Sequence, residues 1–123
     1  MASNDELADA IGRAISTGKG DELASHFAPD AVIWHDTDRK EMDAAAALAG
    51  IAGLSHIAAD LRVDVVKRSP TNDGFVQQFV IHGTILGSGR PLELHNCIVA
   101  TVVDGRITRL DEYVDSTAAS QFA

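Results

Sequence analysis

The chain has 123 residues, of which 46% are hydrophobic, and a formal net charge of −8. Its size and composition fit one domain, residues 1–123, with a core large enough to fold without disulfides or metal. The acidity argues against nucleic acid or an anionic membrane as the main partner, since both need a basic surface. The single cysteine, Cys97, permits no intramolecular disulfide, and no apolar run approaches the length of a membrane span. We therefore expect a soluble cytoplasmic protein.

The N-terminal part is typical of two helices followed by a strand. An acidic start and apolar residues at helical spacing predict a helix over residues 3–17, which the glycines of residues 18–20 end. Asp21 caps a second, shorter helix through Phe27. A strand over residues 31–36 follows.

An alanine-rich stretch then predicts the longest helix of the chain. After a polar loop over residues 36–41, Asp43 begins this helix, which we expect to continue to Leu61. Gly50 and Gly53 lie inside it, and each costs about 1 kcal/mol of helix stability. Small residues at these two positions would let the helix lie close against a sheet.

The C-terminal half predicts a meander of strands. Extended segments over residues 61–68 and 74–86 precede a hairpin in residues 91–115, PLELHNCIVATVVDGRITRLDEYVD. Its Asp104–Gly105 pair supplies the two positive-φ residues of a tight primed turn. The predicted fold class is α+β, with the helices on one face of a curved antiparallel sheet. Bending that sheet around the long helix leaves a concave apolar cavity, where small ligands bind.

Two stretches, HFAPDAVIWHD and GSGRPLELHNCIVATVVDGRITRLDEYVD, carry a family likeness. With the order of elements, they resemble the SnoaL-like branch of the nuclear transport factor two-like superfamily, relatives of ketosteroid isomerases, limonene epoxide hydrolases and polyketide cyclases. The resemblance covers essentially the whole chain. It implies a cone-shaped sheet wrapped on the long helix, a deep apolar pocket, dimerisation through the sheet, and no metal or organic cofactor. It identifies the fold far better than the activity, because the superfamily hosts many functions.

Side chains alternate along strands, so the hairpin divides into two faces. The resemblance places one set toward the pocket, which includes Asn96, Ala100 and Glu112. The other set would lie on the outer face of the sheet, and a bulge would exchange the two sets. The expected apolar lining of the pocket is Ile33, Phe79, Ile81, Leu94, Ile98, Leu110 and Val114.

Three polar residues are candidates for chemistry in that pocket. Glu112 would be a carboxylate aimed at an apolar cavity, suited to act as general acid or base; alternatively it is a solvated or structural acceptor at the mouth. His35 ends the first strand, where the resemblance places the isomerases' base, and its alternative is a strand-end histidine bonded to Asp36 or the next loop. Asn96 could donate to a substrate oxygen or satisfy a backbone group.

The sequence departs from the two best-defined active sites of the family. The resemblance to ketosteroid isomerases calls for a tyrosine on the first helix and an aspartate on a later strand; Ile11, Ile15 and Ile98 stand near these positions. The epoxide-hydrolase pattern needs Arg-x-Asp where this chain has residues 79–81, Phe-Val-Ile. Neither pattern is complete, and only Glu112 remains of the second.

The outer face of the hairpin predicts a contact between two copies. Its apolar stripe is too extensive to remain in water, which favours a two-fold homodimer across the sheets. The five histidines show no HxH, HxxxH or HExxH spacing, so we expect no metal site. The stripe comprises His95, Cys97, Val99, Thr101 and Val103.

These observations lead to two hypotheses of function. In the first, the domain binds a small apolar molecule and performs cofactor-free isomerase, cyclase or hydrolase chemistry, with His35 as base, Glu112 as its acid or orienting partner, and Asn96 as a donor to substrate. In the second, the domain is a non-catalytic ligand-binding or assembly module. Its cone would then be filled by Phe79, Ile81, Ile98 and Phe122.

Overall fold

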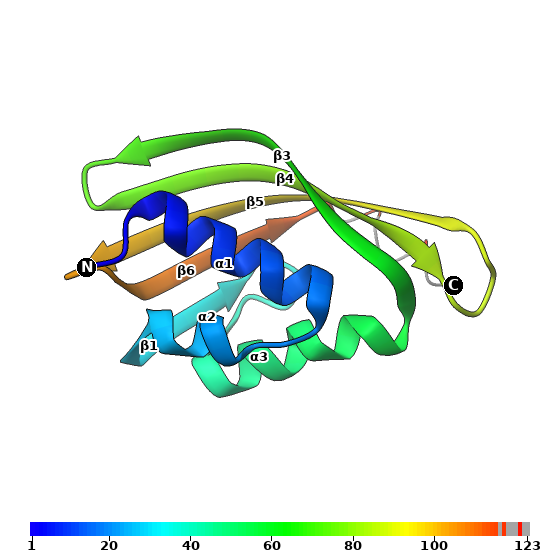
Figure 1. Ribbon diagram of the computed structural model, residues 1–123, viewed down its shortest axis with the longest axis horizontal. Helices are drawn as coiled ribbons and strands as arrows, with labels where there is room; N and C mark the ends of the chain where they lie inside the picture. Colours follow the sequence, from blue (N-terminus) through cyan, green and yellow to red (C-terminus); the bar gives the residue numbers. More distant parts are fainter. Residues whose placement is uncertain (116, 118–120, 122–123) are drawn as a thin grey trace.

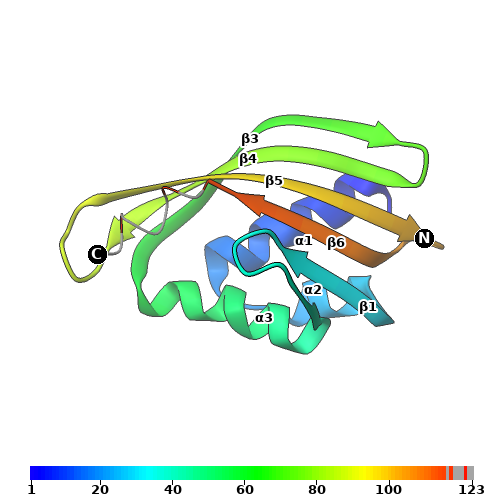
Figure 2. The same cartoon turned by 180° about the vertical axis from the view of Figure 1, so that it is seen from behind.

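The computed structural model describes residues 1–115 together with Thr117 and Gln121. Within these residues, helices pack on one face of a single curved sheet, as the two opposite views in Figures 1 and 2 show. No helix among them is long and apolar enough to cross a membrane. The elements are α1 (Asn4–Thr17), α2 (Asp21–His26), β1 (Phe27–His35), β2 (Lys40–Asp43), α3 (Ala44–Gly53), the 3₁₀ turn η1 (Leu54–His56), β3 (Ala58–Thr71), β4 (Gly74–Ile85), β5 (Pro91–Val103) and β6 (Arg106–Val114).

The sheet has six strands in the order β2-β1-β6-β5-β4-β3. Four neighbouring pairs are antiparallel, but β1 and β6 run parallel, so the sheet is mixed. The α+β class is confirmed, and the expectation of a wholly antiparallel sheet is wrong at this one pair. These two strands can run parallel because a long stretch of chain connects them, and a parallel pair needs such a crossover rather than a hairpin.

Several element boundaries differ from the sequence-based expectation. The strand β1 begins at Phe27, four residues before the predicted start at 31, and a register shift between Phe27 and Val32 accommodates the irregular start. The expected polar loop ends instead in the short edge strand β2. The predicted long helix, α3, ends at Gly53 rather than Leu61, so with 10 residues it is shorter than the 14-residue α1, contrary to expectation. A Cβ added at either of its glycines would meet nothing within 4 Å. The idea that these glycines permit close packing on the sheet is therefore wrong.

The predicted β5–β6 hairpin is confirmed together with its turn. Asp104 and Gly105 have φ values of 52° and 72°, as a primed turn requires. The register shift of this pair lies at residues 101–102, beside the turn. The shift therefore leaves unchanged which residues before it face inward and which face outward. Ile98 and Glu112, both assigned to the inner face, are register partners.

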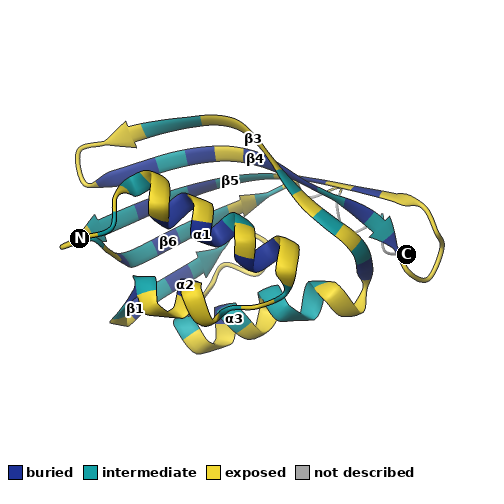
Figure 3. Cartoon of the chain, viewed as in Figure 1, coloured by how far each residue is buried: buried dark blue, intermediate teal, exposed yellow. Residues whose placement is uncertain are grey.

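The core lies between the concave face of the sheet and the helices. Buried and exposed residues alternate along α1 in Figure 3, so one side of this helix is buried, whereas β4 is buried along most of its length. Both Ile33 and Leu110 belong to this core, at 0% and 3% exposure. Phe122, which we expected to fill the cone in the non-catalytic hypothesis, lies outside the described residues. The largest fully buried side chains are Phe75, Leu7, Leu23, Ile33, Leu92, Ile98, Ile107 and Gln77.

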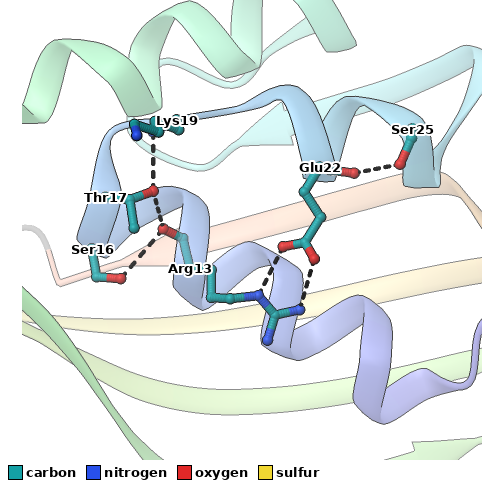
Figure 4. Close-up of polar contacts among 6 residues, drawn as sticks. All are labelled: Arg13, Ser16, Thr17, Lys19, Glu22 and Ser25. Atoms are coloured by element: carbon teal, nitrogen blue, oxygen red, sulfur yellow. Dashed lines mark hydrogen bonds and ion pairs between the residues drawn. The ribbon is translucent and has the colours of Figure 1, made fainter.

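Polar contacts hold α1 in place. The Ser3 side chain accepts a hydrogen bond from the Glu6 backbone N–H and caps the first turn, and Gly18 ends the helix in the left-handed conformation. Arg13 on α1 donates to Glu22 on α2 at 2.8 Å, across the tight turn drawn in Figure 4. This ion pair joins α1 to α2.

Candidate functional site

A cavity of about 300 Å³ lies between the inner face of the sheet and the two helices α1 and α3. This volume is at the small end of the range for ligand pockets, roughly 300–1,000 Å³. Its wall is apolar except for three polar side chains, His35, Asn96 and Glu112. The lining is Ile11, Ile15, His35, Met42, Ala46, Ala47, Gly50, Ile51, Leu54, Phe79, Ile81, Leu94, Asn96, Ile98, Glu112 and Val114.

The parallel pairing of β1 and β6 places His35 beside Glu112. His35 Nε2 lies 2.6 Å from Glu112 Oε2, and the two side chains are only 23% and 22% exposed. The pKa of His35 is raised, chiefly by its hydrogen bond to Glu112, while partial burial acts in the opposite direction. The charges of Glu112, Asp38 and Asp36 add smaller increases in the same direction. The pair is therefore a histidine held by a carboxylate at the edge of an apolar cavity.

Asn96 lies on the neighbouring strand β5 and also lines the cavity. Its Nδ2 donates to the backbone carbonyl of Leu94 at 3.0 Å, which uses one of its two amide hydrogens. The side chain is partly buried. Asn96 thus satisfies a backbone group and still presents an amide to the cavity.

The structure brings together most, but not all, of the residues expected around the pocket. Five apolar residues of the expected lining are on the cavity wall: Phe79, Ile81, Leu94, Ile98 and Val114. Ile33 and Leu110 are not on it, since both are buried in the core. Among the lining residues missed from sequence, Met42 comes from the unpredicted strand β2. The missed lining residues of α1 and α3, such as Ile11 and Ile51, could have been found, because their helical spacing places them on the buried side of each helix.

The outer face of the sheet has its own polar pairs. His82 Nε2 lies 3.0 Å from Asp64 Oδ2, and His95 Nε2 lies 3.0 Å from Glu93 Oε1. A groove of about 580 Å³ on this face is larger in volume than the inner cavity and more open to solvent. Cys97 lines this groove. Within the described residues, no three His, Cys, Asp or Glu side chains gather as a metal site.

We regard the inner cavity as the candidate site. The outer groove is larger, but an open surface sequesters a ligand from water poorly, whereas the inner cavity combines an enclosing apolar wall with convergent polar groups. Ligand pockets are recognised by this combination rather than by volume alone.

These features define a class of protein: an α+β domain whose helices and curved sheet enclose one apolar cavity with polar groups at its edge. The family model of the SnoaL-like domain matches residues 8–110. The chain belongs to the SnoaL-like family, in the nuclear transport factor two-like superfamily. The family inferred from residues 26–36 and 87–115 is thereby confirmed. No curated protein matches the chain.

Solved structures share the fold at low sequence identity. IdmH, a candidate polyketide cyclase from Streptomyces antibioticus, is 21% identical with a TM-score of 0.80, covering 98% of this chain and 97% of its own. AclR, a candidate hydroxylase from Streptomyces galilaeus, is 16% identical with a TM-score of 0.83, covering 97% and 83%. A protein with a ketosteroid isomerase-like fold from Catenulispora acidiphila, in complex with trimethylamine, is 18% identical with a TM-score of 0.79, covering 94% and 90%. At these identities the likeness shows the fold alone.

Proposed function

We propose that this domain binds a small, largely apolar molecule in the inner cavity and transfers a proton on it without a cofactor, as an isomerase, cyclase or hydrolase. The observation that carries the proposal is the 2.6 Å contact between His35 Nε2 and Glu112 Oε2 at the edge of the apolar wall. A base oriented by a second group is the usual arrangement for general acid–base chemistry. Ile11, Ile15 and Ile98 also line the cavity, so an isomerase-type oxyanion hole is not assembled from these positions.

His35 acts as the base in this proposal. A neutral imidazole carries a proton on only one ring nitrogen. When Nε2–H donates to Glu112, Nδ1 therefore has the lone pair that can accept a proton. As a C–H bond of the ligand breaks, its electron pair moves toward a carbonyl or another acceptor, and the proton passes to Nδ1. Glu112 then stabilises the imidazolium, which is consistent with the raised pKa of His35. In an isomerisation the imidazolium returns the proton at a second position of the ligand, so no external reactant is consumed; in a hydrolysis water is the second reactant, and its proton passes to His35 as its oxygen attacks the ligand.

Asn96 and the cavity volume define the ligand further. The second amide hydrogen of Asn96 is the donor for an oxygen of the ligand, where negative charge develops as the proton leaves. A cavity of about 300 Å³ equals the liquid volume of roughly ten waters. The proposed ligand is therefore compact, with a hydrocarbon body and one oxygen function.

The proposal is tested with 5-nitrobenzisoxazole, a neutral probe that opens to a coloured phenolate when a base removes its ring proton. We expect the wild-type protein to accelerate the ring opening over buffer, and His35→Ala or Glu112→Gln to lower the rate by about 100-fold, the scale of general base catalysis. His82→Ala is the matched control, since it removes a histidine–carboxylate pair from the outer face. A rate that is the same after both His35 and Glu112 are replaced would eliminate the catalytic proposal.

The second candidate, a non-catalytic ligand-binding module, is favoured by one observation. His35, Glu112 and Asn96 each already make one hydrogen bond within the chain, so part of their polar capacity is used without a ligand. Binding of the neutral dye N-phenyl-1-naphthylamine separates the cases. We expect binding that Ala47→Leu on the cavity wall weakens and that Ala49→Leu, on the exposed side of the same helix, leaves unchanged. Dye binding without turnover of the probe supports the non-catalytic module.

We also propose a homodimer through the outer face of the sheet. Tyr113 is 46% exposed and Val66 is 66% exposed on the outer groove, and the Trp34 ring contacts Tyr113 at 5.4 Å between centroids. Exposed apolar patches of this kind mark interaction surfaces. We expect a dimer mass by light scattering at micromolar concentration, and a monomer for Tyr113→Glu. The control Ala49→Glu places the same charge on α3 and should remain dimeric; a monomeric wild-type protein would refute the dimer.

A further inference from the structure

The parallel ladder between β1 and β6 ends in an unusual way beside the candidate site. The Asp36 backbone N–H donates to the Glu112 carbonyl at 3.0 Å, one residue beyond the last residue of β1. In a regular parallel ladder the next bond would join the Val114 N–H to the backbone carbonyl of Asp36. Here the Val114 N–H donates to Oδ1 of the Asp36 side chain at 3.0 Å. A carboxylate therefore occupies the position of a strand carbonyl.

The reason lies in the turn that follows. Residues 36–39 form a tight turn that leads the chain back into β2, and the Arg39 N–H donates to the His35 carbonyl at 2.8 Å with Arg39 at a φ of 57°. The turn carries the Asp36 backbone away from β6. Because an aspartate side chain readily substitutes for a backbone acceptor, the ladder gains one more bond than the strand alone would allow.

We propose that Asp36 is a positioning residue for the proton-transfer pair, holding Glu112 against His35 by clamping β6 at two bonds directly after that glutamate. One clamp is the bond from the Asp36 N–H to the Glu112 carbonyl, and the other is the bond from the Val114 N–H to Oδ1. Both bonds lie on the C-terminal side of Glu112, with Tyr113 between them. The inference rests on the proposed function, since it gives Asp36 a role in that same site. Asp36 acts through Glu112 and does not contact the ligand.

The charged groups around His35 separate this role from a purely electrostatic one. Glu112 faces it from β6, Asp36 and Asp38 belong to the following turn, and Lys40 is its register partner on β2. Both aspartates raise the pKa of His35 by their charge, after the larger effect of Glu112. Only Asp36 also accepts a hydrogen bond from β6, whereas Oδ1 of Asp38 accepts from the Lys40 N–H within the turn. A variant of Asp38 therefore serves as the control, because it removes a nearby negative charge without removing a bond to β6.

Three single variants test the clamp, each read by NMR titration of the His35 ring and by the rate with 5-nitrobenzisoxazole. We expect Asp36→Ala to lower the pKa of His35 toward its ordinary value and to lower the rate by about tenfold, because small misplacements of reacting groups cost this much or more. Asp36→Asn keeps the Oδ1 acceptor, so the rate should remain within about threefold of wild type. Asp38→Asn should leave the rate unchanged. A rate for Asp36→Ala equal to wild type overturns the inference.

A double-mutant cycle with Glu112→Gln identifies the route of the effect. If Asp36 acts through Glu112, Asp36→Ala lowers the pKa of His35 by much less in the Glu112→Gln background than in wild type. An equal lowering in both backgrounds shows that Asp36 acts by its own charge and overturns the inference. The ring titration needs no turnover, so it decides on the clamp even if the wild-type protein leaves the probe unreacted, a result that would refute only the catalytic proposal.

Discussion

Two histidine–carboxylate pairs lie on opposite faces of the same sheet, and their surroundings differ more than their chemistry. On the inner face, His35 and Glu112 are 2.6 Å apart and 23% and 22% exposed. On the outer face, His82 and Asp64 are 3.0 Å apart, and the Asp64 side chain is 66% exposed. Partial burial strengthens an ion pair, whereas water screens an exposed one. The face of the sheet on which a pair lies therefore decides how strongly water screens it.

The same contrast applies to the apolar residues, and it gives the largest expected effect. Ile98 points to the inner face and is 2% exposed, while its neighbour Val99 points outward and is only partly buried. We expect Ile98→Ala to lower the free energy of unfolding by about 3 kcal/mol, since it removes buried methyl groups and enlarges a cavity. Val99→Ala should cost about 1 kcal/mol or less. Urea unfolding at one fixed protein concentration measures both, and equal losses would contradict the assignment of the two faces.

Two arginines extend the comparison to charged side chains. On the inner side, Arg68 Nε donates at 2.7 Å to Oε1 of Gln77, which is 1% exposed. The same guanidinium bonds to Asp5 and Asp9 on α1, each at 2.9 Å. The outer-face Arg109 pairs with acidic residues on the surface and is 41% exposed.

We expect Arg68→Ala to cost about 2 kcal/mol of unfolding free energy, because it leaves the buried Gln77 oxygen without its partner. Arg109→Ala should cost about 0.5 kcal/mol, the scale of a surface ion pair. Thermal or urea unfolding measures the difference. The double variant Arg68→Ala with Gln77→Leu removes both partners and should recover part of the loss; no recovery would show that Arg68 stabilises the fold mainly through Asp5 and Asp9.

Local chemistry made part of this fold predictable from sequence. The Asp104–Gly105 turn was predictable because few residues adopt two successive positive φ values, and alternation along both strands of the hairpin divided their residues into two faces. The edge strand β2 was missed because its sequence, Lys-Glu-Met-Asp, is mostly charged. The end of α3 was misplaced because the only local sign of it is Gly53, and a single glycine is also tolerated inside a helix.

The candidate site was predictable in composition but not in geometry. Strand alternation assigns Glu112 to one face of its strand, and the family resemblance made that face the inner one and placed His35 in the same site. Their contact depends on the parallel register of β1 and β6, in which His35 pairs with Glu112, and no local pattern encodes that register. The Asp36 clamp depends on the same register. Tertiary pairing therefore decides whether inward polar residues meet.

The smallest expected effect concerns the pH dependence of stability. The folded pKa of His35 is raised above the ordinary value of about 6.5, so the stabilisation from its pairing with Glu112 is fully present below that pH. It is lost as the pH rises through the raised folded pKa. We expect the difference in unfolding free energy between wild type and Glu112→Gln to be about 1 kcal/mol at low pH and to shrink as the pH increases.

The outer pair supplies the matched measurement. Asp64→Asn should change the unfolding free energy by only a few tenths of a kcal/mol at any pH in the same series, because the exposed carboxylate is screened by water. Urea unfolding of the four proteins, wild type, Glu112→Gln, Asp64→Asn and the double variant, should start at about pH 5.5, above the ordinary range of carboxyl groups. Equal pH profiles for the two single variants would mean that burial does not distinguish the inner pair, and the case for His35 and Glu112 as the reactive pair would lose its physical basis.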